Sequence, residues 1–383
     1  MKVLVIGSGP VGLAALLGLK NKSNAIKVFL SEETQNEKTH HQLFGIPTIS
    51  SFSGRGGLGR FWHNVLDITY TQANYSSSSI SHMLKYFWSI NFLELEYDIK
   101  NLSTHTGLEI VPRVPLRPQK RKDLFQDLIL MPAVSQLVPK STCTQVVFEN
   151  NSRQDFDRVI VCSGVFGTSR LLKKSGLARE KQSIGDHLIF ISPGEARLEN
   201  PQLKVTARRK NFISRNYFQN GPNKIMLRPC FTKKEKKSLI YNKSTLGTIF
   251  DIIGNFDFGT LMESTNLRYG YPTTGSTFKM VAQVSVGDAY FKEKLDDVRS
   301  NQKKINEIIT SLEPYRTENK LQILSGIHFY NVAEINSIDI SSIPVEDTNI
   351  AVFSPALELE MPSNHFTFSI MLAAFEYALN MSN

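Results

Sequence analysis

A strand, a glycine turn and a helix follow one another at the start of the chain, and this order constrains the fold more than any other feature. Lys2–Ile6 is predicted to be a short buried strand, the letters GSGPVG follow at once, and Leu13–Leu19 continues as an apolar helix. In such a G-x-G-x-x-G turn, Gly7 permits the tight bend, Gly9 lets the backbone approach a pyrophosphate, and Gly12 lets helix and strand pack closely. The pattern predicts a dinucleotide whose pyrophosphate lies at the helix N-terminus.

A carboxylate stands where such a site needs one. The next strand, predicted at Ala25–Leu30, is followed by Glu32, which is 20 residues after Gly12. An acid at about this distance holds the hydroxyls of the adenosine ribose. Glu33 is the neighbouring alternative, and the turn alone does not decide between NAD and FAD.

A second glycine cluster lies at Ser53–Val65, which includes Gly56 and Gly57. Glycines leave the backbone without a side-chain shield, so main-chain N–H groups can lie against a flat or anionic ligand. A mobile surface loop is the alternative. Phe61 and Trp62 favour the first interpretation, because exposing such side chains to water is unfavourable.

A third pattern is the string Asp157–Leu177, DRVIVCSGVFGTSRLLKKSGL. Val159–Cys162 is predicted to be a buried strand, and a helix is predicted to start near Gly167-Thr168-Ser169. The turn between them would place Gly164 beside the cofactor. A purely structural crossover is the alternative.

The last part of the chain carries two further candidates. A strand is predicted at Thr348–Val352 and a long apolar helix at Phe368–Leu379. Asn364 lies just before that helix and could simply cap it, since Asn is a favoured N-cap residue. Upstream, His328 stands among apolar neighbours, where a structural role is the alternative to catalysis.

Together these strings resemble the glucose–methanol–choline (GMC) family of FAD-dependent oxidoreductases, as a short member. The string Asp157–Leu177 is similar to the family's VILAAGAIGSPRLLLLSGIG, and Gly185-Asp186-His187 resembles a shortened G-x-x-L-x-D-H segment. Asn364-x-x-Thr367 resembles the family's N-x-x-T ending. All occur in the family's order, across about half of the chain.

The resemblance implies an enzyme that oxidises a CH–OH group of an alcohol or sugar by hydride transfer to flavin N5. His328 would accept or orient the hydroxyl proton, and Asn364 would be its catalytic partner. Val134 matches the valine whose backbone meets the adenine. Phe61 stands where covalent members have histidine, which implies non-covalent FAD. The alternatives are a flavin-containing lyase of the same fold and a redox-silent flavoprotein.

Charge and cysteine content indicate the class of partner. The segment 188–320 holds 22 Lys and Arg against 13 Asp and Glu, which equals the net charge of +9 of the whole chain. A solvated basic face or an anionic small-molecule substrate explains this excess. No pattern points to nucleic acid, to a membrane span or to a bound metal. The three cysteines, Cys143, Cys162 and Cys230, are far apart, which favours a reducing compartment, the cytoplasm.

These patterns predict an α/β fold. A discontinuous, doubly wound (Rossmann-like) FAD-binding domain is expected from residues 1–187 and 321–383. Residues 188–320 are expected to form an inserted, smaller α+β substrate domain. Within it, Thr277–Val286 is predicted as a strand and Leu295–Leu312 as an amphipathic helix. The oligomeric state is left open.

Overall fold

The structure is a computed structural model of the chain. It describes residues 1–20, 26–33, 37–43, 46–60, 62, 64–100, 106–180, 183–191, 205–220, 225–229, 278–287, 322–325, 333–335, 349–357 and 366–381. The predicted helix at 295–312 lies outside these residues.

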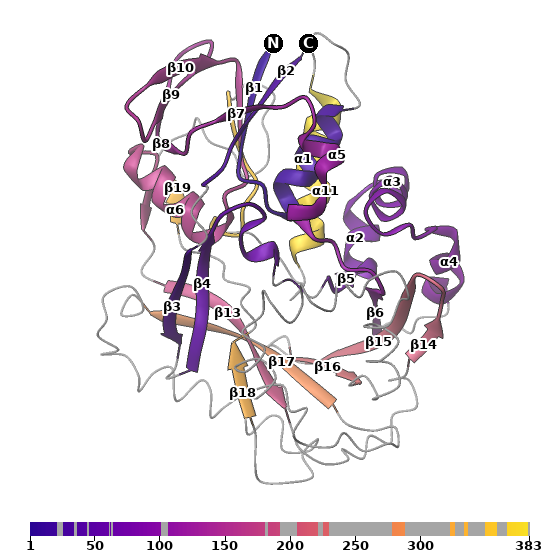
Figure 1. The fold of residues 1–383 in the computed structure, drawn as a ribbon. Coiled ribbons are helices and arrows are strands. Elements are labelled where there is room, and N and C mark those ends of the chain that lie inside the picture. The colour runs from indigo at the N-terminus through magenta and orange to yellow at the C-terminus, as the bar shows by residue number, and fades with distance from the viewer. Residues whose placement is uncertain are drawn as a thin grey trace.

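A five-stranded sheet forms the centre of one part of the molecule (Figure 1). All neighbouring strands in it are parallel. Their order is β20 (Ile350–Val352), β11 (Arg158–Val161), β1 (Lys2–Ile6), β2 (Lys27–Ser31) and β7 (Ile129–Met131). The strand from the end of the chain therefore lies in the same sheet as the first strand. The predicted α/β, Rossmann-like fold is confirmed.

Both faces of this sheet are buried, as expected for near-continuous apolar strands in a parallel sheet. Val3 and Val5 face α1 (Pro10–Lys20) and α11 (Phe366–Asn380), which pack side by side. A Cβ added to Gly18 of α1 would lie 2.6 Å from the carbonyl oxygen of Phe375 in α11. This glycine therefore allows the two helices to approach closely.

The opposite face is covered by α6 (Gly164–Lys174) and by a three-stranded antiparallel meander. The meander consists of β8 (Val134–Pro139), β9 (Thr144–Phe148) and β10 (Arg153–Phe156). Leu4 and Ile6 of β1 point into this core together with Leu172 of α6. Alternate residues of one strand thus fill two different cores, which fixes the register of the central strand.

A second, eight-stranded sheet forms the other part of the molecule, and its neighbouring strands are antiparallel. Its order is β18 (Gln322–Ser325), β13 (Ser183–Ile191), β17 (Phe278–Gly287), β16 (Ile225–Pro229), β15 (Phe212–Asn220), β6 (Thr106–Pro112) and β5 (Leu66–Asp67), with β14 (Val205–Arg208) paired to β15. β17 agrees with the strand predicted at 277–286.

This sheet takes strands from both sides of the proposed domain boundary. β5 and β6 come from the first segment, residues 1–187. β6 pairs with β15 of the inserted segment, and β5 pairs with β6. β13 itself crosses residues 187 and 188. The division into an FAD-binding domain (1–187 and 321–383) and a substrate domain (188–320) stays a proposal. With these boundaries, the two domains would share one sheet.

The remaining elements connect and cover these sheets (Figure 1). Two strand pairs are β3 (Glu37–Leu43) with β4 (Ile46–Ser53) and β12 (Ala178–Glu180) with β19 (Ala333–Ile335). The helices are α2 (Ile68–Asn74), α3 (Ser77–Trp88), α4 (Leu93–Lys100) and α5 (Lys122–Phe125), with short 3-10 turns at Gly57–Arg60 and Pro118–Lys120. Trp88 of α3 packs edge-to-face on Phe368 of α11.

One predicted boundary is wrong. The helix α6 begins at Gly164, three residues before the predicted start near Gly167. Gly164 has a φ of +72°, a conformation that glycine adopts at little cost. The chain therefore turns from β11 into α6 within two residues.

Candidate nucleotide-binding site

Two glycines of the turn after β1, Gly7 and Gly12, cannot be replaced by another residue without displacing neighbouring backbone atoms. Gly7 has a φ of +103°, and a Cβ there would lie 2.5 Å from the carbonyl oxygen of Cys162. A Cβ on Gly12 would lie 2.0 Å from the carbonyl oxygen of Gly7. Pro10 occupies the first helical position, where its missing N–H costs nothing. The turn is thus pressed against the end of β11.

This position is the topological switch point of the parallel sheet. From β1 the chain continues to β2 and β7 on one side of the sheet, and later adds β11 and β20 on the other. In open α/β sheets, ligands bind outside the carboxyl ends of the strands at this point. Gly7 follows β1 and Gly164 follows β11, so the two turns border the crevice.

The glycine-rich loop is docked on the same turn. The N–H of Gly56 donates to the hydroxyl of Ser8 over 2.9 Å, and both residues are buried. A Cβ on Gly59 would lie 2.2 Å from Cδ of Pro10. Trp62 is 8% exposed and packs in the core with α3. These contacts contradict a solvated surface loop and set the loop beside the nucleotide turn.

Glu32 lies at the carboxyl end of β2 with one oxygen paired and one unpaired. Its Oε1 accepts hydrogen bonds from Nε of Arg55 at 2.8 Å and from Nη2 at 2.5 Å. Its Oε2 is buried and has no hydrogen-bond partner in the described part of the chain. Glu33, the alternative acid, is exposed and 3.4 Å from Nη2 of Arg170.

Two other predicted residues lie at defined places. A Cβ on Gly164 would meet nothing within 4 Å, so space is open in front of the α6 turn. The hydroxyl of Ser354, after β20, donates to the carbonyl oxygen of Gly164 over 3.0 Å. Val134 begins β8 and packs, half-buried, against the core between meander and sheet. A contact of Val134 with an adenine stays a prediction.

The predicted catalytic pair falls on segments that the structure does not describe. His328 and Asn364 both lie outside the described residues, as does Phe61. Gly185-Asp186-His187 forms part of β13 in the antiparallel sheet. The roles predicted for these residues therefore stay predictions.

The cysteine beneath the turn is structural. Cys162 is buried, and burial raises the pKa of its thiol far above the ordinary range. Such a thiol stays neutral and unreactive. Cys143 is also a free cysteine, and Cys230 lies outside the described residues.

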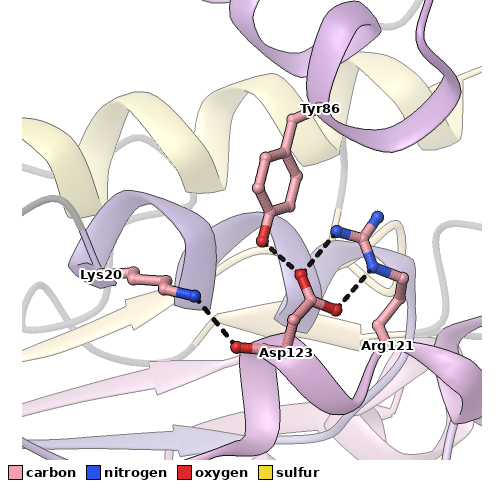
Figure 2. Close-up of polar contacts among 4 residues, drawn as sticks. All are labelled: Lys20, Tyr86, Arg121 and Asp123. Carbon is pink, nitrogen blue, oxygen red and sulfur yellow. Dashed lines mark hydrogen bonds and ion pairs between the residues drawn. The ribbon is translucent and has the colours of Figure 1, made fainter.

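A second polar cluster joins α3, α5 and α1 (Figure 2). Both carboxylate oxygens of Asp123 accept from Arg121, at 2.9 and 2.8 Å, and the hydroxyl of Tyr86 donates to Asp123 over 2.6 Å. Lys20 donates to the carbonyl oxygen of Asp123. The bonds from Arg121 hold the pKa of Asp123 well below its usual range. Burial, and then the bond to Asp123, raise the pKa of Tyr86 to about 12.

Sequence reasoning missed three residues that tie this region together: Ser8, Arg55 and Ser354. Ser8 stood inside the glycine pattern, where small polar residues carry no signal of their own. Arg55 lies among glycines, 23 residues after Glu32, and only the fold brings the two together.

In the part of the chain that the structure describes, no group of metal-ligating side chains occurs. No helix within the described ranges is long and apolar enough to cross a bilayer.

Comparison with known proteins gives distant structural likenesses only. No protein-family model matches the chain, and no curated protein matches it. The tetracycline destructase Tet(51) is 12% identical, with 98% of this chain and 80% of that chain covered and a TM-score of 0.37. Klebsiella pneumoniae HpxO, complexed with FAD and uric acid, is 11% identical, with 99% and 78% covered and a TM-score of 0.39. The flavin-dependent brominase Bmp2 is 10% identical, with 99% and 77% covered and a TM-score of 0.39.

These structures correct the predicted reaction. They are named as a destructase and a brominase, and another is an anhydrotetracycline hydroxylase from Streptomyces rimosus. The prediction of alcohol or sugar oxidation is therefore wrong, and membership of the GMC family in particular is not supported. FAD, by contrast, agrees with the FAD complexes of HpxO and CtdE.

Proposed function

We propose that this chain is an FAD-dependent oxidoreductase that acts on a small molecule. The observation that carries the proposal is the buried, unpaired Oε2 of Glu32 beside a glycine turn at the switch point of a parallel sheet. A buried carboxylate oxygen without a partner is unfavourable, so a ligand hydroxyl that donates to it would be stabilising. The adenosine ribose of FAD supplies such hydroxyls.

The residues present fit the ADP half of this cofactor. A Cβ on Gly9 would meet only the carbonyl oxygen of Gly56, at 3.7 Å, so main-chain N–H groups at the start of α1 could approach the pyrophosphate there. Glu32 would hold the ribose. Gly56 and Gly57, with φ values of +90° and +50°, form the loop that lies on this turn. Gly164 borders open space, and we assign it to the wall next to the flavin half.

FAD supplies the redox chemistry, by accepting a hydride or by reacting with oxygen once reduced. The protein binds and orients. The glycine turn would stabilise the negative charge of the pyrophosphate through backbone dipoles, and the loop docked on it would shield this turn from water. His328 and Asn364 remain the predicted substrate-side residues, and Val134 the predicted adenine contact. We propose non-covalent FAD, an anionic or neutral small-molecule substrate and the cytoplasm as the compartment.

The test is flavin content followed by turnover. Purified protein should be yellow, and acid precipitation should release all of the flavin as FAD. Because the similar structures include a hydroxylase and a brominase, the first assay should follow NADH or NADPH oxidation and oxygen consumption with candidate aromatic substrates. Colourless protein that does not bind added FAD would overturn the proposal. If the protein binds FAD but no reductant or substrate reduces it, the protein is a flavin-binding protein and the proposed oxidoreductase activity is wrong.

A further inference from the structure

Arg55 is fixed on Glu32 by both arms of its guanidinium group. Nε and Nη2 donate to the same oxygen, Oε1, at 2.8 and 2.5 Å. The Glu32 side chain is 9% exposed, whereas that of Arg55 is 39% exposed. The buried partner is thus the carboxylate, and the arginine approaches it from the solvent side.

Arg55 is itself held in place. Its guanidinium lies 4.7 Å from the centre of the Phe125 ring, a distance typical of a cation–π contact. The next residue, Gly56, donates its N–H to Ser8 in the nucleotide turn. Adjacent residues of the glycine-rich loop therefore contact two separate nucleotide-facing segments, the turn after β1 and the end of β2.

We propose that Arg55 is a positioning residue that acts through Glu32. By taking up Oε1, it fixes the carboxylate and leaves Oε2 as the acceptor for the adenosine ribose. Burial removes the water that would otherwise stabilise the negative charge of Glu32, and the positive charge of Arg55 takes over this role. This inference rests on the proposed function, because the ribose belongs to the proposed FAD.

The geometry favours arginine over lysine at this position. Two donors of one planar group converge on one oxygen, and the carbon of the same group lies over an aromatic ring, 4.7 Å from its centre. A lysine ammonium can supply the charge, but it lacks the planar fork and the flat face. Arg55→Lys should therefore restore only part of the function that Arg55→Met removes.

The experiment is FAD titration of full-length protein from which flavin has been removed by dialysis. Arg55→Met should weaken FAD binding by at least about tenfold, as expected for loss of charge-assisted positioning. Arg55→Lys should lie between this variant and the wild type. Arg170→Met is the matched control, because Arg170 pairs with the exposed Glu33. This variant should bind FAD like the wild type. Urea unfolding of each FAD-free variant checks that the fold is intact.

A double-mutant cycle separates positioning from a purely structural role. If Arg55 acts through Glu32, Arg55→Met in a Glu32→Ala background should cause no further loss of FAD affinity. Additive losses would overturn the proposal, as would an Arg55→Met variant that binds FAD like the wild type. Wild-type protein that binds no FAD would instead overturn the proposed function together with this inference, so the two failures are distinguishable.

Discussion

Two of the arginine–carboxylate pairs that the structure describes differ in which carboxylate oxygens they leave without a hydrogen bond. In the pair of Arg121 with Asp123, both carboxylate oxygens are taken by the arginine, and Tyr86 adds a further donor. In the pair of Arg55 with Glu32, one oxygen receives both donors and the other is buried and unpaired. A fully paired carboxylate stabilises a fold, whereas a half-paired, buried one leaves an acceptor oxygen that a ligand hydroxyl can use.

The sharpest test of this contrast is ligand affinity. Glu32→Ala should raise the dissociation constant for FAD roughly a hundredfold, because a hydrogen bond to a charged group is worth about 1.5–3 kcal/mol. Asp123→Ala should leave that constant within about twofold. Isothermal titration of both variants measures the difference. Equal affinities for the two variants would remove the distinction between the pairs.

Stability should respond in the opposite order. Asp123→Ala should lower the free energy of unfolding by about 1 kcal/mol, since the side chain links α3 to α5 but is 47% exposed and so partly screened by solvent. Glu32→Ala in the FAD-free protein should cost less. Urea titration at neutral pH gives both values. A larger loss for Glu32→Ala would show that Glu32 is the structural carboxylate.

The smallest effect should appear at alkaline pH. The pKa of Tyr86 in the fold is about 12, above the ordinary value of 10.0, so its contribution to stability is complete below pH 10 and is lost as pH rises toward 12. Tyr86→Phe lacks this contribution at every pH. The difference in unfolding free energy between wild type and variant, less than about 1 kcal/mol at pH 8, should therefore shrink between pH 10 and 12. A constant difference would assign it to packing alone.

The acidic side follows the reverse rule. The pKa of Asp123 is lowered, so the stability from this carboxylate is present above its ordinary value of 3.8 and is lost as pH falls below it. Asp123→Ala should accordingly match the wild type most closely in acid. The same urea titrations, extended below pH 4, measure this.

Local signals in the sequence predicted the nucleotide turn well. β1 has the predicted bounds Lys2–Ile6, and β2, β11 and β20 lie within two residues of prediction. This succeeds because Gly7 and Gly12 are required by contacts within a few residues and with the adjacent strand. Buried parallel strands also leave continuous apolar runs, which are easy to recognise.

Contacts between distant segments were not predictable in this way. No short sequence pattern indicates that β6 pairs with β15, or that Arg55 contacts Glu32. Each contact depends on the path that the long segment between the two partners takes through the fold. The reaction was mispredicted for a related reason. The string DRVIVCSG predicts how a strand turns into a helix, and such a turn carries no information about the substrate.

The close packing of Gly18 against Phe375 has a consequence for how the protein folds. The two helices, α1 at Pro10–Lys20 and α11 at Phe366–Asn380, are far apart in the sequence, so their contact closes a very long loop. Until α11 docks, α1 has an apolar flank open to water. Binding of the proposed FAD at the N-terminus of α1 should therefore follow the docking of α11.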